Sequence, residues 1–201
     1  MERTRRYLGA VAALAALMLV AAACSDDPDT AEGDTAGAGA AAAAPFGSAC
    51  SELPASGAGS VEGMMTAAVA EAAAANPLLS SLVMDLELAG LTDTLNSADG
   101  LTVFAPTNDA FAAAAEADPE GMEAMMADPT GDFAGLLSYH VVEGQIPPDE
   151  LAGEHTTLEG STLTVEGSGE SFTVDGTAMV VCGDIHTDNA TVYVIDGVLH
   201  P

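Results

Sequence analysis

The chain has 201 residues, with 31 acidic side chains against only three basic ones, and a formal net charge of −28 at pH 7. This balance excludes nucleic acid as a natural partner, because binding to phosphates requires Lys or Arg to displace counterions. An anionic membrane surface repels such a chain for the same reason, so the composition favours a salty or cation-rich medium outside the cell.

The first 24 residues have the order of an export signal. All three arginines lie in the first six positions, an apolar run follows over 7–20, and three alanines precede Cys24. This order predicts a lipoprotein signal peptide over residues 1–23. The stretch VAAAC resembles a bacterial lipobox, although Ala21 stands where Leu is usual. Cys24 is therefore the expected lipidation site, and its lipid would anchor the mature protein to a membrane. The alternative is an ordinary signal with an incidental cysteine.

The cysteine count bears on the same question, because three is an odd number for an exported chain. Lipidation of Cys24 leaves Cys50 and Cys182 as a pair, and an oxidising compartment favours a disulfide between them. Two buried free thiols are the alternative. The cysteines and histidines are too scattered for a zinc site, and we expect no metal and no other cofactor.

The folded part is expected to begin at residue 50. Residues 24–49 are acidic and rich in Ala and Gly, and this composition cannot bury enough apolar surface to offset the entropy of ordering. We predict a disordered tether there, followed by one domain over 50–201.

The first half of that domain has helical signals. Thr66 is the expected N-cap of a helix through Ala75, and Asn76-Pro77 begins another that Gly90 ends. Thr107 is the expected cap of a later helix, which Phe111 anchors by burial. A strand is predicted over 101–105, and further short helical stretches are predicted after Asp118-Pro119, after Asp128-Pro129 and over 131–138.

The second half has strand signals, with β-branched runs separated by Gly-rich turns. Asp175-Gly176 predicts a hairpin turn. Residues 191–195 are apolar on both faces, which favours a central strand. Helices first and strands later are typical of an α+β domain. The other predicted strands cover residues 162–166, 171–174 and 178–181.

Three motifs resemble the signature boxes of the fasciclin-domain family. They are TVFAPTNDAF at 102–111, YHVV at 139–142 and ATVYVIDGVLHP at 190–201. With Cys50 and Cys182, the chain resembles in particular the secreted and lipid-anchored single-domain antigens of mycobacteria, in which the two equivalent cysteines form a disulfide. The resemblance implies a wedge-like β-sandwich with packed N-terminal and connecting helices. It also implies adhesion or interaction at cell surfaces, without catalysis.

The resemblance also singles out candidate interaction residues. In animal relatives the Tyr-His pair and its branched neighbours are linked to receptor adhesion, so Tyr139, His140, Val141 and Val142 are candidates here. The alternative is a packing role, in which His140 bonds backbone groups of the core and Tyr139 fills space. Asn108 and Asp109 of the first motif are further candidates, and the alternative for that motif is a structural role, in which Asp109 favours the helix dipole.

The sequence thus predicts an exported, lipid-anchored surface protein, monomeric in its folded part, that binds an unidentified envelope or extracellular protein or glycan. No G-x-S-x-G, phosphate-binding Gly loop, H-E-x-x-H or C-x-x-C motif favours an enzyme. One alternative is a small-ligand or glycan-binding protein that uses a cleft between helices and sandwich. Another is diffuse cation binding by the acidic surface. An apolar pocket would favour the ligand-binding protein, and an exposed apolar patch around Tyr139 would favour adhesion.

Overall fold

A computed structural model of the chain describes residues 44–201. The predictions for the signal peptide, for Cys24 and for most of the tether lie outside these residues. Within the described part, no helix combines the length and the apolar character that crossing a membrane requires.

Seven strands form one sheet in the order β2-β1-β7-β6-β5-β4-β3. The neighbours β1 and β7 run parallel, and every other pair is antiparallel. The strands are β1 Leu101–Pro106, β2 Val141–Glu143, β3 Gly153–Thr156, β4 Thr162–Ser168, β5 Ser171–Val174, β6 Ala178–His186 and β7 Ala190–Ile195.

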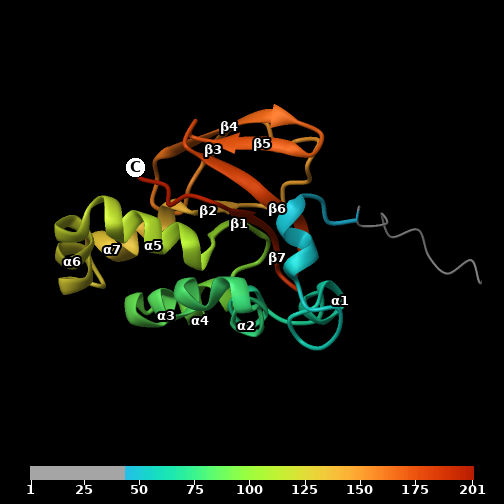
Figure 1. The fold of residues 1–201 in the computed structure, drawn as a ribbon, viewed down its shortest axis with the longest axis horizontal. Helices are drawn as coiled ribbons and strands as arrows, with labels where there is room; N and C mark the ends of the chain where they lie inside the picture. Colours follow the sequence, from blue (N-terminus) through green and yellow to red (C-terminus); the bar gives the residue numbers. More distant parts are fainter. Residues whose placement is uncertain (1–43) are drawn as a thin grey trace, which may run out of the picture. The chain divides into compact units, whose positions relative to one another are not determined.

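The sheet folds back on itself until its two ends nearly meet. Figure 1 shows β3, β4 and β5 above β1, β2 and β7, with the long strand β6 passing between the two layers. At the open edge Val142 forms an isolated bridge with Thr157, and the Leu158 N–H donates to the Val141 carbonyl at 2.7 Å. One curved sheet therefore supplies both layers of the predicted sandwich.

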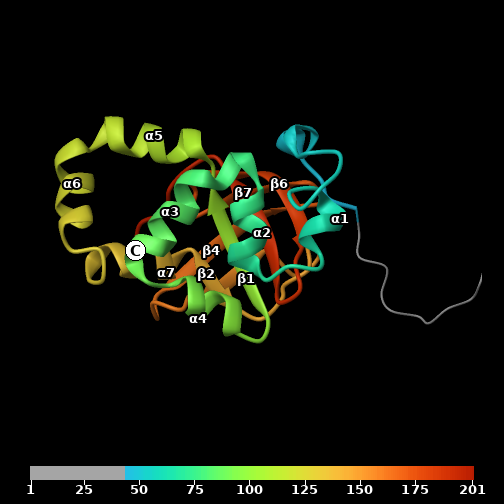
Figure 2. The ribbon, with the colours of Figure 1, turned by 90° about the horizontal axis from the view of Figure 1, so that it is seen from below.

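Helices cover the face of β1 and β7 that points away from the space enclosed by the folded sheet. In Figure 2 the helices α2, α3 and α4 lie across these strands, while α5 and α6 extend past the sheet edge. The α+β prediction is confirmed. Within residues 44–201 the helices are α1 Val61–Met64, α2 Val69–Ala75, α3 Ser80–Ala89, α4 Thr92–Ser97, α5 Asn108–Ala117, α6 Pro119–Ala127 and α7 Asp132–Tyr139, with 3-10 turns η1 Ser48–Glu52 and η2 Pro77–Leu79.

Several helix ends lie where the sequence predicts them. The Thr107 hydroxyl accepts from the Ala110 N–H at 3.1 Å at the start of α5, and Asp118 caps α6 in the same way. Gly90, with φ of 71°, ends α3, and the Leu91 N–H donates back to the Leu86 carbonyl. Asp128-Pro129, by contrast, forms a turn before α7 and begins no helix.

The predicted cap of the first helix is wrong. Helix α2 begins at Val69, and Thr66 instead donates to the Gly63 carbonyl at 3.1 Å. The first N–H groups of α2 donate to side-chain oxygens from far along the chain. Val69 donates to Asn189 at 2.9 Å, and Ala70 donates to Asn96 at 3.0 Å. These distant amides satisfy the N–H groups that a local cap would otherwise satisfy.

The sheet separates two hydrophobic cores. Val103 and Val192 face the helices, while Phe104 and Tyr193 face the space enclosed by the folded sheet. Every residue of β1 and of β7 is buried, which confirms that residues 191–195 form a central strand.

The fold begins before residue 50, so the predicted boundary of the tether is placed too late. Phe46 exchanges two backbone hydrogen bonds with Gly183 of β6, at 3.1 and 2.8 Å. Its ring is buried, with its centroid 5.8 Å from that of Phe172. The Cys50–Cys182 disulfide, which confirms the predicted pairing, then joins η1 to β6.

Candidate functional site

Tyr139 lies at the end of α7 with its ring in the core, where only 4% of its surface is exposed. Its hydroxyl donates to Asp175 Oδ2 at 2.8 Å. Asp175 sits at the predicted β5–β6 turn with φ of 49°, and its other oxygen accepts from the Thr164 N–H at 2.8 Å. Burial and the bond to Asp175 raise the pKa of Tyr139 to about 12. Tyr139 therefore links helix α7 to a hairpin turn of the sheet.

His140 is fully enclosed and uses both ring nitrogens. The Leu199 N–H donates to Nε2 at 2.9 Å, so the proton is on Nδ1, which lies 2.8 Å from the Leu136 carbonyl and donates to it. Burial lowers the pKa of His140 to about 4, a shift that the bond to Leu136 opposes. A neutral His140 thus joins the end of α7 to the last residues of the chain.

Val141 and Val142 complete the motif on opposite sides of β2. Val141 packs with the helices, Val142 packs inside the folded sheet, and both are buried. The four residues form no exposed patch, so they do not provide the contact surface expected of them. Their contacts support the packing alternative. Substitution of Tyr139 and His140 by alanine would therefore report on folding and not on binding. It removes volume from the core and leaves buried polar groups without hydrogen-bond partners.

Because His140 is buried in its neutral form, we expect the free energy of unfolding to depend on pH in a way that a variant with a non-titrating residue at this position lacks. In the unfolded chain its pKa is 6.5 and in the fold about 4, so the unfolded state binds more protons between these values. The stability that neutral His140 contributes is complete above pH 6.5 and falls as the pH falls. We therefore compare the free energy of unfolding of the wild type with that of His140→Gln. As the pH is lowered from 6.5 to 4, the difference between the two should change by about 3 kcal/mol, to the disadvantage of the wild type.

Denaturant titrations at several pH values measure this difference directly. The half-buried carboxyl of Asp85, whose pKa is raised to about 6 by partial burial, changes stability in the opposite direction, but it is present in both proteins and its effect cancels. Parallel pH profiles of the two proteins would contradict a neutral, buried His140.

Asn108 and Asp109 lie at the start of α5 and behave differently. The Asn108 amide donates to the Pro77 carbonyl at 2.8 Å, and its oxygen accepts from the Ser81 N–H at 2.9 Å. Asn108 thus fixes the start of α5 against the start of α3. Asp109, in the first turn of α5, is exposed.

Asp109 lines an open groove of about 550 Å³, which we call the acidic groove. Its other carboxylates are Glu52 from η1 and Asp196 from the turn after β7, and its apolar lining includes Ala49, Leu78 and Val181. Asp196 belongs to the motif at 190–201 but is not one of the candidate residues, and no sequence pattern indicated Glu52. The predicted Cys50–Cys182 pairing is the one signal that places Glu52 near β6.

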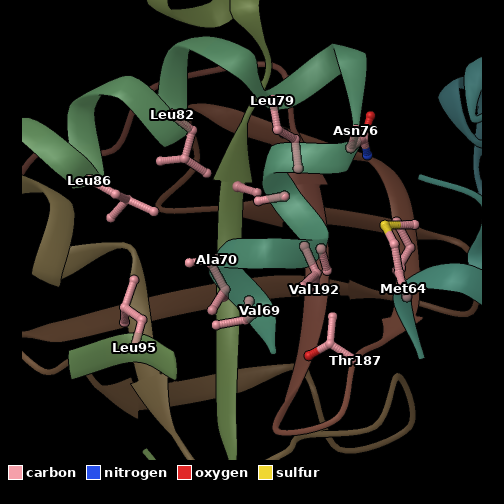
Figure 3. A pocket seen from close by; sticks show the side chains of 15 residues that line it. Met64, Val69, Ala70, Asn76, Leu79, Leu82, Leu86, Leu95, Thr187 and Val192 are labelled. Atoms are coloured by element: carbon pink, nitrogen blue, oxygen red, sulfur yellow. The ribbon is translucent and has the colours of Figure 1, made fainter. Parts of the chain in front are cut away.

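A second cavity lies between the helices and the sheet, at the place that a small-ligand cleft would occupy. Figure 3 shows its lining, with Leu79, Leu82 and Leu86 of the α3 region facing Val69 of α2 and Val192 of β7. The buried Asn76 side chain also lines it, and its Nδ2 has no hydrogen-bond partner.

The volume of this apolar cavity is about 20 Å³. That is room for one water molecule, whereas a dry cavity that binds benzene measures roughly 150 Å³. The cavity therefore cannot hold a ligand unless the helices move away from the sheet, and it gives no support to a ligand-binding function.

The described residues offer no strong cation and little internal charge pairing. No Lys or Arg follows Arg6 in the sequence. Across residues 44–201 the one contact at ion-pair distance joins His186 Nε2 to Asp184 Oδ1 at 3.1 Å, and it is an ion pair only when His186 is protonated. Asp184 is buried, has φ of 60°, and burial raises its pKa. In the same range no group of three His, Cys, Asp or Glu side chains converges as metal ligands would.

Residues 77–201 match the sequence model of the Fasciclin domain. Immunogenic protein MPB70 of Mycobacterium bovis is 41% identical over 200 residues, which cover 96% of this chain and 95% of MPB70. Cell surface glycolipoprotein MPB83 of the same species is 43% identical over 146 residues, or 69% of this chain and 63% of MPB83, so the match spans less than two thirds of MPB83.

The fold also matches a solved structure, a FAS1 domain pair from the insect cell adhesion molecule Fasciclin I. The TM-score is 0.61 at 17% sequence identity, and the match covers 69% of this chain and 52% of that chain. At this identity the comparison establishes the shared fold.

Proposed function

We propose, from the premise that this chain belongs to the fasciclin-domain family, that it is an exported, lipid-anchored surface protein that binds other components of the cell envelope without catalysis. The observation that carries the proposal is its likeness to mycobacterial proteins named as an immunogenic protein and a cell surface glycolipoprotein. The apolar run and three alanines before Cys24 support export and lipid attachment.

The chemistry of the described residues supports a non-catalytic role. The titratable members of the Tyr-His motif are buried, and each is bonded to structural partners. A general acid or base must reach the proton that it transfers, and neither side chain is accessible to a substrate.

Lipid attachment is tested by replacing Cys24. We expect the wild-type protein to partition into detergent, to carry diacylglycerol on Cys24 in a mass spectrum, and to be cleaved by protease added to intact cells. Cys24→Ser should lose the lipid and leave the detergent phase, because two acyl chains provide stable anchoring and no other membrane attachment is proposed.

Ser25→Ala is the matched control, since it changes the neighbouring residue and leaves the thiol in place. It should behave as the wild type does. If Cys24→Ser stays with the detergent as firmly as the wild type, or if wild-type Cys24 carries no lipid, the anchoring proposal fails.

A further inference from the structure

The walls of the acidic groove are held in place by the fold. The Cys50–Cys182 disulfide ties η1, which carries Glu52, to strand β6. Asn108 ties the start of α5, which carries Asp109, to η2 and the start of α3 through three hydrogen bonds. Asp196 accepts from the Met179 N–H at 2.7 Å, so its carboxylate is also oriented. The groove is therefore formed before any partner arrives.

The groove combines negative charge with an apolar lining. Glu52, Asp109 and Asp196 come from three separate segments and line the same groove as Ala49, Leu78 and Val181. No Lys or Arg of the chain after residue 6 is available to neutralise them. The complementary surface is one that carries positive charge beside apolar groups.

Whether the carboxylates converge decides between a bound ion and a larger partner. A bound calcium ion needs several oxygen ligands within about 2.6 Å. No three acidic, His or Cys side chains converge in that way among residues 44–201, so these carboxylates do not surround one ion. Separate carboxylates along a groove instead match several cationic groups on one extended molecule.

We propose that the acidic groove binds a short segment of a partner protein in which Lys or Arg side chains stand beside apolar ones. The inference rests on the proposed function, since it names the partner chemistry of a surface module. The charged heads would bond to Glu52, Asp109 and Asp196, and the alkyl stems would cover Leu78 and Val181. A volume of about 550 Å³ is the size of a typical recognition site and accommodates a few side chains.

The test measures fluorescence anisotropy of a labelled octapeptide that alternates Lys or Arg with Leu or Val. Titration with the full chain in 0.15 M NaCl gives its Kd. The groove variant carries Glu52→Gln, Asp109→Asn and Asp196→Asn, and the last of these changes keeps a side-chain oxygen for the Met179 N–H. The control carries Glu120→Gln, Glu123→Gln and Glu166→Gln, three exposed carboxylates outside the groove.

Both variants lose three negative charges, so they differ only in where on the protein the charges are removed. The groove variant is expected to weaken the Kd at least about tenfold and the control less than about threefold, because only the groove pairs each cation with a carboxylate beside an apolar surface. Equal melting temperatures of the two variants verify that folding is preserved. If the Kd of the peptide weakens equally in both variants, the proposal is overturned, because the peptide is then attracted by the overall negative charge and not by the groove.

A second arm tests the apolar contribution and small cations. A peptide of equal charge with Gly in place of Leu and Val should bind at least about fivefold more weakly, since it buries less apolar area. Equal affinity, or displacement of the first peptide by spermine at the same charge concentration, would overturn the proposal. Envelope proteins still captured by the groove variant would reject the groove and leave the proposed function standing.

Discussion

Replacing Cys50 and Cys182 together by alanine is expected to lower the free energy of unfolding by about 5 kcal/mol in the chain-entropy model. The disulfide closes a loop between residues 132 apart in sequence, and its loss returns that freedom to the unfolded chain. Most domains are stable by only about 5–15 kcal/mol, so the variant should be close to unfolding. Chemical denaturation at fixed salt concentration measures the difference.

The controls separate the bond from the side chains. Wild-type protein treated with a reducing agent should lose a similar amount of stability, while Cys24→Ala, which lies outside the loop, should lose none. Cys182 is fully buried, so part of the loss in the alanine variant also comes from its sulfur contacts. An unchanged denaturation midpoint in the double variant would show that the bond does not stabilise the fold.

The second large effect is expected from salt. The chain after Cys24 contains 30 of the 31 acidic side chains and no Lys or Arg, and of the carboxylates in residues 44–201 only Asp184 is fully buried. Mutual repulsion therefore acts across the surface, and the Debye length falls from about 30 Å at 0.01 M to about 3 Å at 1 M.

We expect the melting temperature to rise by at least about 6 °C between 10 mM and 2 M NaCl, which corresponds to about 2 kcal/mol for a domain of this size. Divalent cations should act at lower concentration. A rise of about one or two degrees would show that the charges are tolerated without screening, and an equal rise with sucrose would assign the effect to solute exclusion.

Local signals in the sequence predicted those parts of the fold that depend on neighbouring residues. Thr107, Asp118 and Gly90 act within three or four positions of themselves, and each marks the helix end that it was expected to mark. The prediction that Thr66 caps the first helix is wrong because the N–H groups of α2 donate to Asn96 and Asn189, which approach α2 only when the chain is folded. A pattern within ten residues contains no information about such partners.

The same distinction explains the candidate site. The family resemblance marked Tyr139 and His140 as candidate interaction residues. In the fold they form hydrogen bonds with Asp175 and Leu199, which lie 36 and 59 positions further along. The acidic groove takes residues from η1, α5 and the turn after β7, so no continuous motif describes it. Asn108 and Asp109 were singled out through the family resemblance, and the structure gives them different roles.

The most direct test of the account is photo-crosslinking from two positions in the full-length protein, produced in intact cells. A photoreactive residue replaces Ala113, which is exposed and lines the acidic groove, or Ala124, which is exposed on α6 outside it. We predict that position 113 crosslinks to an envelope protein, through a peptide that carries Lys or Arg within a few residues of the adduct, and that position 124 does not. Absence of any adduct at position 113, or the same adduct in equal yield at both positions, would contradict the account.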